Sequence, residues 1–237
     1  TVDAEVTSLG QSFNNAHLLG GYRHDSRTAN FTNELGVDHT VRYLKNIMGL
    51  WVLNEAVRTW HDQGMEIALP EADAAAAAAE PLRTVVDIND ASFYSPGDMA
   101  ARIDEAAHAT GQPCPRDIGE YIRCINDSLA LAYRRAVRQA VELSGREVKV
   151  LHIVGGGIRN RLLCQLAADA TGLPVLAGPA EGTALGNVVI AARGAGVIDG
   201  DLSDLRRLIR SSSRLTRYTP DLDTSSNWDD VERRLFG

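Results

Sequence analysis

Three consecutive glycines, Gly155, Gly156 and Gly157, are the residues of this 237-residue chain best suited to receive a ligand. They follow an apolar run rich in β-branched residues at 148–154 and precede a stretch in which leucines and alanines recur every three or four residues. This order predicts a buried strand, a tight turn and the start of a helix. Glycine permits positive φ and close approach of a ligand, and N–H groups at a helix start favour an anionic one. The turn therefore indicates a site for a nucleotide or another phosphate-bearing molecule.

Two established phosphate-binding motifs do not fit this turn. A dinucleotide fingerprint requires a third glycine at position 160, which is Asn160. A P-loop requires Gly-Lys-Ser/Thr, and neither of the two lysines, Lys45 and Lys149, follows a glycine. A strand-to-helix turn without any ligand remains the alternative, because glycine is common in such turns.

Side chains suited to acid–base or nucleophilic chemistry are scattered along the chain. No G-x-S-x-G, H-E-x-x-H or zinc spacing is present. His152 lies inside the predicted strand and is interpreted as a buried, hydrogen-bonded histidine. Asp25, in the sequence His24-Asp25-Ser26, could act as a general base, but nothing in the polar stretch around it would hold or desolvate it. We therefore assign no catalytic residue.

The composition narrows the class of protein. A formal charge of −7 argues against nucleic acid as a main partner, because binding its phosphates requires a basic surface. No apolar run approaches the roughly 20 residues of a membrane span, and no signal peptide opens the chain. The three cysteines, Cys114, Cys124 and Cys164, are far apart and lack metal-ligand spacing. We expect them to be small buried side chains in a reduced, cytoplasmic protein.

Helical and strand patterns alternate, which predicts an α/β fold with right-handed crossovers. The strands near residues 150 and 175, joined by a helix at 159–171, should form one parallel unit with a ligand crevice at the carboxyl end of the first strand. Around them we expect a turn at 30–36, a helix that begins at Asp38 and a strand at 84–88. Further helices are expected at residues 98–110, 117–143, 182–193 and 203–213, and a last helix docked by Trp228 and Leu235. The alanine-rich run at residues 73–80 is expected to be a surface helix or a spacer.

Two long stretches of the sequence carry a resemblance to a known family. The first is ANFTNELG, continued after four residues by VRYLKNIMGLWVLNE, and the second is VLHIVGGGIRNRLLCQLAADATGLPVLAGPAEGTALGN. Together they resemble the C-terminal, nucleotide-binding domain of the FGGY family of carbohydrate kinases, and within it the kinases of L-rhamnulose. The resemblance covers residues 29–220.

The resemblance implies a ribonuclease-H-like α/β domain of the actin/hexokinase/Hsp70-like ATPase superfamily, with a mixed sheet flanked by helices. It implies an enzyme that uses ATP and Mg²⁺ to phosphorylate the 1-hydroxyl of L-rhamnulose or a related ketose. By resemblance, the three glycines, Asn160 and Asn54 lie on the nucleotide side of the cleft, and Asn46 contacts the sugar or the phosphates near it. For Asn46 and Asn54 the alternative is polarity at a helix surface or cap.

The chain also departs from the family pattern. In family members a first domain supplies a phosphate loop and most of the sugar site, and the catalytic aspartate precedes the NFTNELG stretch. Neither is found here, so residues 1–28 are interpreted as a poorly ordered leader unrelated to the family, and residues 221–237 as an acidic tail. We expect the chain alone to be inactive and to need an N-terminal kinase domain as its partner. A non-catalytic remnant or binding module that keeps only the nucleotide-side fold is the alternative.

Overall fold

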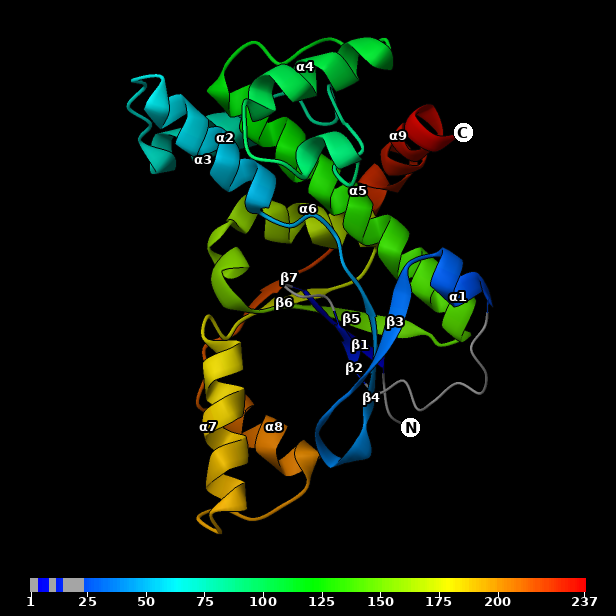
Figure 1. Cartoon of the computed structure of the whole chain (residues 1–237), viewed down its shortest axis with the longest axis vertical. Coiled ribbons are helices and arrows are strands. Elements are labelled where there is room, and N and C mark those ends of the chain that lie inside the picture. The colour runs from blue at the N-terminus through cyan, green and yellow to red at the C-terminus, as the bar shows by residue number, and fades with distance from the viewer. Residues whose placement is uncertain (1–3, 9–11, 15–23) are drawn as a thin grey trace. The chain divides into compact units, whose positions relative to one another are not determined.

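The strand, turn and helix predicted around the glycines are all present (Figure 1). In the computed structural model, β5 (Val148–Ile153) leads into the 3₁₀ turn η3 (Gly155–Arg159), and α6 (Arg161–Thr171) follows. β6 (Val175–Ala177) then pairs with β5 in the parallel direction. This arrangement confirms the predicted strand–helix–strand unit.

The chain divides into two units, and each is described by itself. The structure describes residues 4–8, 12–14 and 24–237. Unit 1 consists of Thr1–Asn46, Ala136–Cys164 and Leu173–Thr219. Unit 2 consists of Ile47–Arg135, Gln165–Gly172 and Pro220–Gly237.

The described part of unit 1 forms a seven-stranded mixed sheet in the order β3-β4-β2-β1-β5-β6-β7. The strands not yet given are β1 (Ala4–Ser8), β2 (Ser12–Asn14), β3 (Phe31–Leu35), β4 (Val41–Lys45) and β7 (Thr216–Tyr218). β1 is parallel to β5, and two antiparallel pairings lead from β1 through β2 to β4. β4 therefore runs in the same direction as β1, β5 and β6, and the carboxyl ends of these four strands lie at one edge of the sheet.

Two helices of unit 1, α7 (Gly182–Gly194) and α8 (Leu202–Ser211), lie side by side (Figure 1). Near the end of α7, the Arg193 guanidinium donates two hydrogen bonds of 2.7 and 2.8 Å to the Asp38 carboxylate. This pairing lowers the pKa of Asp38 because it favours the charged form. The ion pair connects α7 to the turn between β3 and β4.

Part of the stretch that we expect to be a poorly ordered leader has regular secondary structure. Where residues 1–28 are described, they form β1, β2 and α1 (His24–Thr28), and β1 pairs with β5 from Ala4 to Ser8. The run Glu5-Val6-Thr7 is too short to show a strand period, and its place beside β5 is what makes it a strand. The parts of the expectation that concern residues 1–3, 9–11 and 15–23 lie outside the described residues.

The predicted turn at 30–36 and the predicted helix from Asp38 were wrong. A hairpin occupies this region, in which β3 and β4 are joined through the 3₁₀ turn η1 (Val37–His39) and the helix begins only at Trp51. The ring of Tyr43 in β4 stacks on Phe31 in β3 with centroids 4.5 Å apart. This cross-strand aromatic pair stabilises the strand in a stretch that also fits a helical period.

The described part of unit 2 is helical. It contains α2 (Trp51–Asp62), α3 (Leu69–Ala78), η2 (Ala91–Phe93), α4 (Met99–Ala109), η4 (Leu222–Thr224), α9 (Ser225–Phe236) and the first part of α5 (Ile118–Ser144). α4 starts where predicted, because the Asp98 carboxylate accepts the Ala101 N–H at 3.0 Å as an N-cap. Fully buried apolar residues form the core, among them Val52, Phe93, Met99, Ile103, Ile122, Ile125, Leu129 and Trp228.

The predicted strand at 84–88 is absent; the segment Arg83–Ile88 has no regular secondary structure. The backbone of Val85 exchanges hydrogen bonds with the side-chain amide of Gln112, at 3.0 and 2.8 Å. The Val86 N–H donates to Ser128 Oγ at 3.0 Å. Side chains from elsewhere in unit 2 therefore satisfy the groups that a neighbouring strand would have paired.

The segment predicted as an acidic tail contains α9, whose Trp228 is buried, as expected for a docked last helix. The buried Arg134 of α5 donates to Asp229 and Glu232 of α9. All three cysteines are free, and Cys124 and Cys164 are buried as predicted, whereas Cys114 is only partly buried. In the described ranges, no helix combines the length and apolar character that crossing a bilayer would require.

Candidate functional site

The candidate site lies at the edge of the unit 1 sheet where β4, β5 and β6 end. The glycine turn follows β5, Gly178 follows β6, and Asn46 follows β4. β4 and β5 are separated by β2 and β1, so Asn46 is three strand spacings, about 14 Å, from the line of β5. The topology thus places the predicted sugar-side residue and the predicted nucleotide turn at the same edge of the sheet.

The glycine turn leaves its main chain open at one position. Gly155 has a φ of 77°, in the region that favours glycine. Gly156 is exposed, and a Cβ added to it would meet no atom within 4 Å. Gly157 is buried. Gly156 is therefore the glycine at which a ligand can lie against the backbone, and the bend is not enclosed by the fold.

Asn160 shapes the end of the turn. Its Oδ1 accepts the Leu163 N–H at 2.9 Å, which caps the start of α6. Its own N–H donates to the Gly157 carbonyl at 3.1 Å. The structure therefore gives this predicted nucleotide-side residue a definite local role, as the residue that joins the turn to the helix.

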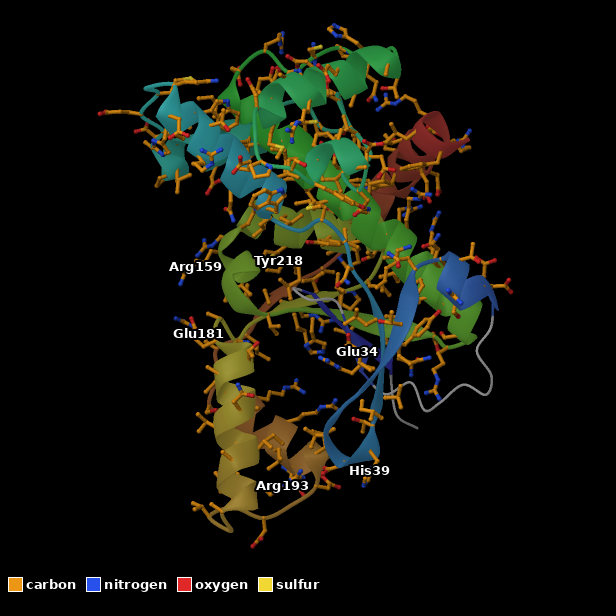
Figure 2. All side chains as sticks on the ribbon, viewed as in Figure 1. Glu34, His39, Arg159, Glu181, Arg193 and Tyr218 are labelled. Carbon is orange, nitrogen blue, oxygen red and sulfur yellow. The ribbon has the colours of Figure 1, made fainter. Side chains whose placement is uncertain are left out.

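Positive charge flanks the turn. Arg159 and Arg161 are both exposed and lie on either side of Asn160. The N-terminus of α6, which carries a partial positive charge, is at the same place. In Figure 2, Arg159 and Glu181, the residue before α7, project outward on the same side of the picture. The combination of guanidinium groups, a helix start and a bare glycine favours a phosphate-bearing ligand.

The pKa shifts beside the turn belong to packed neutral groups. Burial raises the pKa of Cys164 to about 11, so this thiol stays protonated, and it donates to the Gly157 carbonyl at 3.8 Å. Burial also raises the pKa of Tyr218, and the nearby Arg161 opposes that rise. Cys164 therefore supports the turn, and neither group is tuned to accept a proton near neutral pH.

The other candidate residues have simpler surroundings. Asn46 is exposed, directly after a strand and not on a helix. Asn54 is exposed on α2 and belongs to unit 2. His152 is partly buried in β5 and has an interaction partner, and Asp25 is exposed on α1. The structure thus brings the three glycines and Asn160 into one turn and leaves Asn54 in the other unit.

Comparison with known proteins decides the family. Residues 15–195 match the model of the C-terminal domain of the FGGY family of carbohydrate kinases. The chain belongs to this family. The match reaches upstream of residue 29, into the stretch that we had interpreted as unrelated to the family.

Curated relatives of this FGGY domain are kinases. A rhamnulokinase of Bacteroides thetaiotaomicron is 42% identical over 205 residues, which cover 86% of this chain and 41% of the relative. A rhamnulokinase of Klebsiella pneumoniae strain 342 is 40% identical over 196 residues, which cover 83% of this chain and 39% of the relative. The FGGY chain therefore spans about two fifths of the length of these relatives.

Solved structures share the fold. The xylulose kinase of Rhodospirillum rubrum superposes with a TM-score of 0.63 at 19% identity. The match covers 98% of this FGGY chain and 45% of the xylulose kinase chain. The glycerol kinase of Plasmodium falciparum with ADP superposes with a TM-score of 0.65 at 15% identity. The match covers 99% of this chain and 47% of the glycerol kinase chain. The predicted α/β fold with a mixed sheet is thereby confirmed.

Two features of the site were not assigned from the sequence. The exposed Arg159 and Arg161 were part of the family stretch but carried no pattern of their own. The loop that begins at Gly178 contacts the turn through its backbone, which only the pairing of β5 with β6 shows. Gly-Pro is typical of a turn, but the partner of such a turn cannot be read from the sequence.

Proposed function

We propose that this chain is the nucleotide-binding half of an ATP-dependent sugar kinase. Joined to an N-terminal kinase domain, it would transfer the γ-phosphate of ATP to the 1-hydroxyl of L-rhamnulose. Membership of the FGGY family supports the kinase chemistry, and the names of the curated relatives support L-rhamnulose as the sugar.

The observation that carries the nucleotide assignment is the open backbone at Gly156. A ligand at this position meets main chain, since no atom lies within 4 Å of an added Cβ, and the exposed Arg159 and Arg161 follow in the same turn and at the start of α6. The related glycerol kinase structure contains ADP, which supports an adenine nucleotide as the ligand. In this proposal Gly155, Gly156, Gly157 and Asn160 form the nucleotide side.

Asn46 and Asn54 have separate roles in the proposal. Asn46 is exposed at the sheet edge where the turn lies, so we assign its amide to the sugar or to the phosphates near it. Asn54 is exposed on α2, and we assign it to the nucleotide side. An amide supplies both a donor and an acceptor, which suits hydroxyl and phosphate groups alike.

Mg²⁺ enters the proposal together with ATP. In the part of the chain that the structure describes, no three His, Cys, Asp or Glu side chains are grouped as a metal site. Mg²⁺ commonly keeps several waters and is held by substrate phosphates with one or two carboxylates. We therefore propose that this half holds the nucleotide and that the ion arrives on its phosphates.

The proposal also divides the catalytic work between two domains. Phosphoryl transfer depends on positioning and on electrostatic stabilisation of the transferred group. One half of a cleft lacks the enclosure that excludes water and the second set of phosphate contacts. We therefore propose that ATP binding belongs to this chain and that turnover requires the N-terminal domain.

The Gly156→Val substitution tests the nucleotide assignment. The new side chain meets no protein atom within 4 Å of its Cβ, so it should block the ligand without displacing the fold. We expect ATP affinity, measured by calorimetry with Mg²⁺, to fall by about tenfold or more, which corresponds to at least 1.4 kcal/mol.

Gly194→Val is the matched control, because Gly194 at the other end of α7 also has no atom within 4 Å of an added Cβ. Its ATP affinity should equal that of the wild type. Equal affinity of folded Gly156→Val and wild type would remove the glycine turn from the site.

A further inference from the structure

A second loop holds the glycine turn in place. It runs from Gly178, directly after β6, to Gly182, the first residue of α7. The Gly178 N–H donates to the Ile153 carbonyl at 2.8 Å, and the Gly155 N–H donates to the Pro179 carbonyl at 3.0 Å. The hydrogen bonding between β5 and β6 thus continues beyond both strands, and its last bond is made by the first glycine of the turn.

Gly178 fixes this loop from the side of β7. Its φ of 126° is rarely adopted by other residues, and an added Cβ would lie 2.7 Å from the Arg214 carbonyl oxygen. It would also lie 3.1 Å from a side-chain carbon of Leu215. A side chain at position 178 must therefore displace either the loop or the main chain that leads into β7.

Gly182 fixes the other end of the loop against the turn itself. An added Cβ would lie 3.3 Å from the Cβ of Val154 and 3.7 Å from both of its γ carbons. Val154 directly precedes Gly155. Since a packed region transmits even small displacements, a larger side chain at position 182 moves the residue that introduces the turn.

We propose that Gly178 and Gly182 are positioning residues for the bound nucleotide. The loop between them sets the main-chain position of Gly155–Gly157, and so ATP affinity depends on two residues that act through the turn. This inference rests on the proposed function, because it assumes that ATP lies against Gly156.

The Gly182→Val variant of the 237-residue chain tests the proposal. We expect its affinity for ATP with Mg²⁺, measured by calorimetry, to fall by about tenfold. Gly186→Val is the matched control, since Gly186 lies one turn further along α7 and has no atom within 4 Å of an added Cβ. It should bind ATP as the wild type does, and its thermal midpoint should match that of Gly182→Val.

A rescue separates positioning from general stability. Val154→Ala removes both γ carbons, which lie 3.7 Å from an added Cβ at position 182, and keeps the Cβ at 3.3 Å, so we expect a partial rescue. The double variant Gly182→Val/Val154→Ala should recover ATP affinity to within about threefold of Val154→Ala alone, as expected for two contacting residues whose effects are not additive. Gly178→Ala should weaken ATP binding and also lower the thermal midpoint, because its methyl group meets main chain.

The possible outcomes distinguish the inference from the proposed function. If Gly156→Val loses ATP affinity while Gly182→Val keeps it, the positioning role is wrong and the nucleotide site stands. The role is structural and the inference is wrong if two results are found together. The loss of ATP affinity in Gly182→Val is then explained by the fraction of unfolded protein, and adding Val154→Ala does not restore ATP affinity. A wild-type chain that binds no ATP would overturn the proposed function and this inference with it.

Discussion

Two segments without regular strand or α-helix, one in each unit, are held in opposite ways. The glycine turn after β5 is fixed by main-chain bonds to the loop at Gly178–Pro179, and Gly156 stays exposed. The segment Arg83–Ile88 is fixed mainly by side chains, since Gln112 and Ser128 bond to its backbone and are 6% and 1% exposed.

The two segments differ in whether their backbone is open to a ligand. A main-chain bond from Gly155 holds the turn and leaves the space at Gly156 open, so the backbone itself can face a ligand there. Side-chain bonds fill the space around residues 83–88 and remove its backbone groups from water. We therefore expect substitutions at the turn to change binding, and substitutions around residues 83–88 to change stability.

The largest expected effect on the free energy of unfolding is at Asp127, which supports the segment that contains residues 83–88. Its carboxylate accepts both the buried Arg123 guanidinium, at 3.0 Å, and the Leu82 N–H, at 2.8 Å. Leu82 has a φ of 57°, which is costly for a leucine and is maintained by this bond. Asp127→Ala should lower the free energy of unfolding by about 3–5 kcal/mol, because it leaves Arg123 buried without its partner.

Urea unfolding of unit 2, followed by tryptophan fluorescence, measures this loss. Asp230, which pairs with Arg233 at the surface, is the control, and Asp230→Ala should change little. A loss at Asp127 no larger than at Asp230 would contradict the comparison.

The contribution of Asp127 to the free energy of unfolding should also depend on pH, and this is an effect of intermediate size. Burial raises the pKa of Asp127 to about 6 from an ordinary value of 3.8, although Arg123 and the Leu82 N–H oppose the rise. The folded state therefore holds the proton more tightly than the unfolded state, and this contribution to stability is lost as the pH rises from about 4 to about 6.

Comparison with Asp127→Asn isolates this group from the other carboxylates. The unfolding free energy of the wild type minus that of the variant should fall by about 2 kcal/mol between pH 4 and pH 7. A difference that stays constant with pH, or that rises, would show that the Asp127 pKa is not raised.

The smallest expected change in stability is at Gly156. Because its φ is outside the positive range and no atom lies within 4 Å of an added Cβ, Gly156→Val should shift the unfolding free energy by no more than about 0.5 kcal/mol. Thermal unfolding without ATP measures this shift. A loss as large as that at Asp127 would mean that the turn is as tightly held as residues 83–88, and the contrast between the two segments would fail.

The sequence was sufficient to predict those elements whose pattern depends only on residues close together in the chain. The run from residue 148 to the glycines predicted β5 and the turn, and Asp98 marked the start of α4 by a cap that needs only its own helix. The long apolar stripe of residues 117–143 predicted α5 to within a residue at each end. The two stretches that resemble the family also identified the fold, by sequence similarity alone.

Tertiary structure decided the elements whose partners lie far away in the chain. The sequence VRYLK fits a helical period, and pairing with β2 and β3 makes it β4. Residues 84–88 have the composition of a strand, but Gln112 and Ser128 take the bonds that a neighbouring strand would make. At the site, the sequence located the glycines, and only the tertiary structure places Gly178 and Gly182 beside Ile153 and Val154, which lead into them. A hydrogen bond or a contact between distant residues depends on the whole fold, whereas a turn, a cap or a helical stripe depends on its nearest neighbours in the chain.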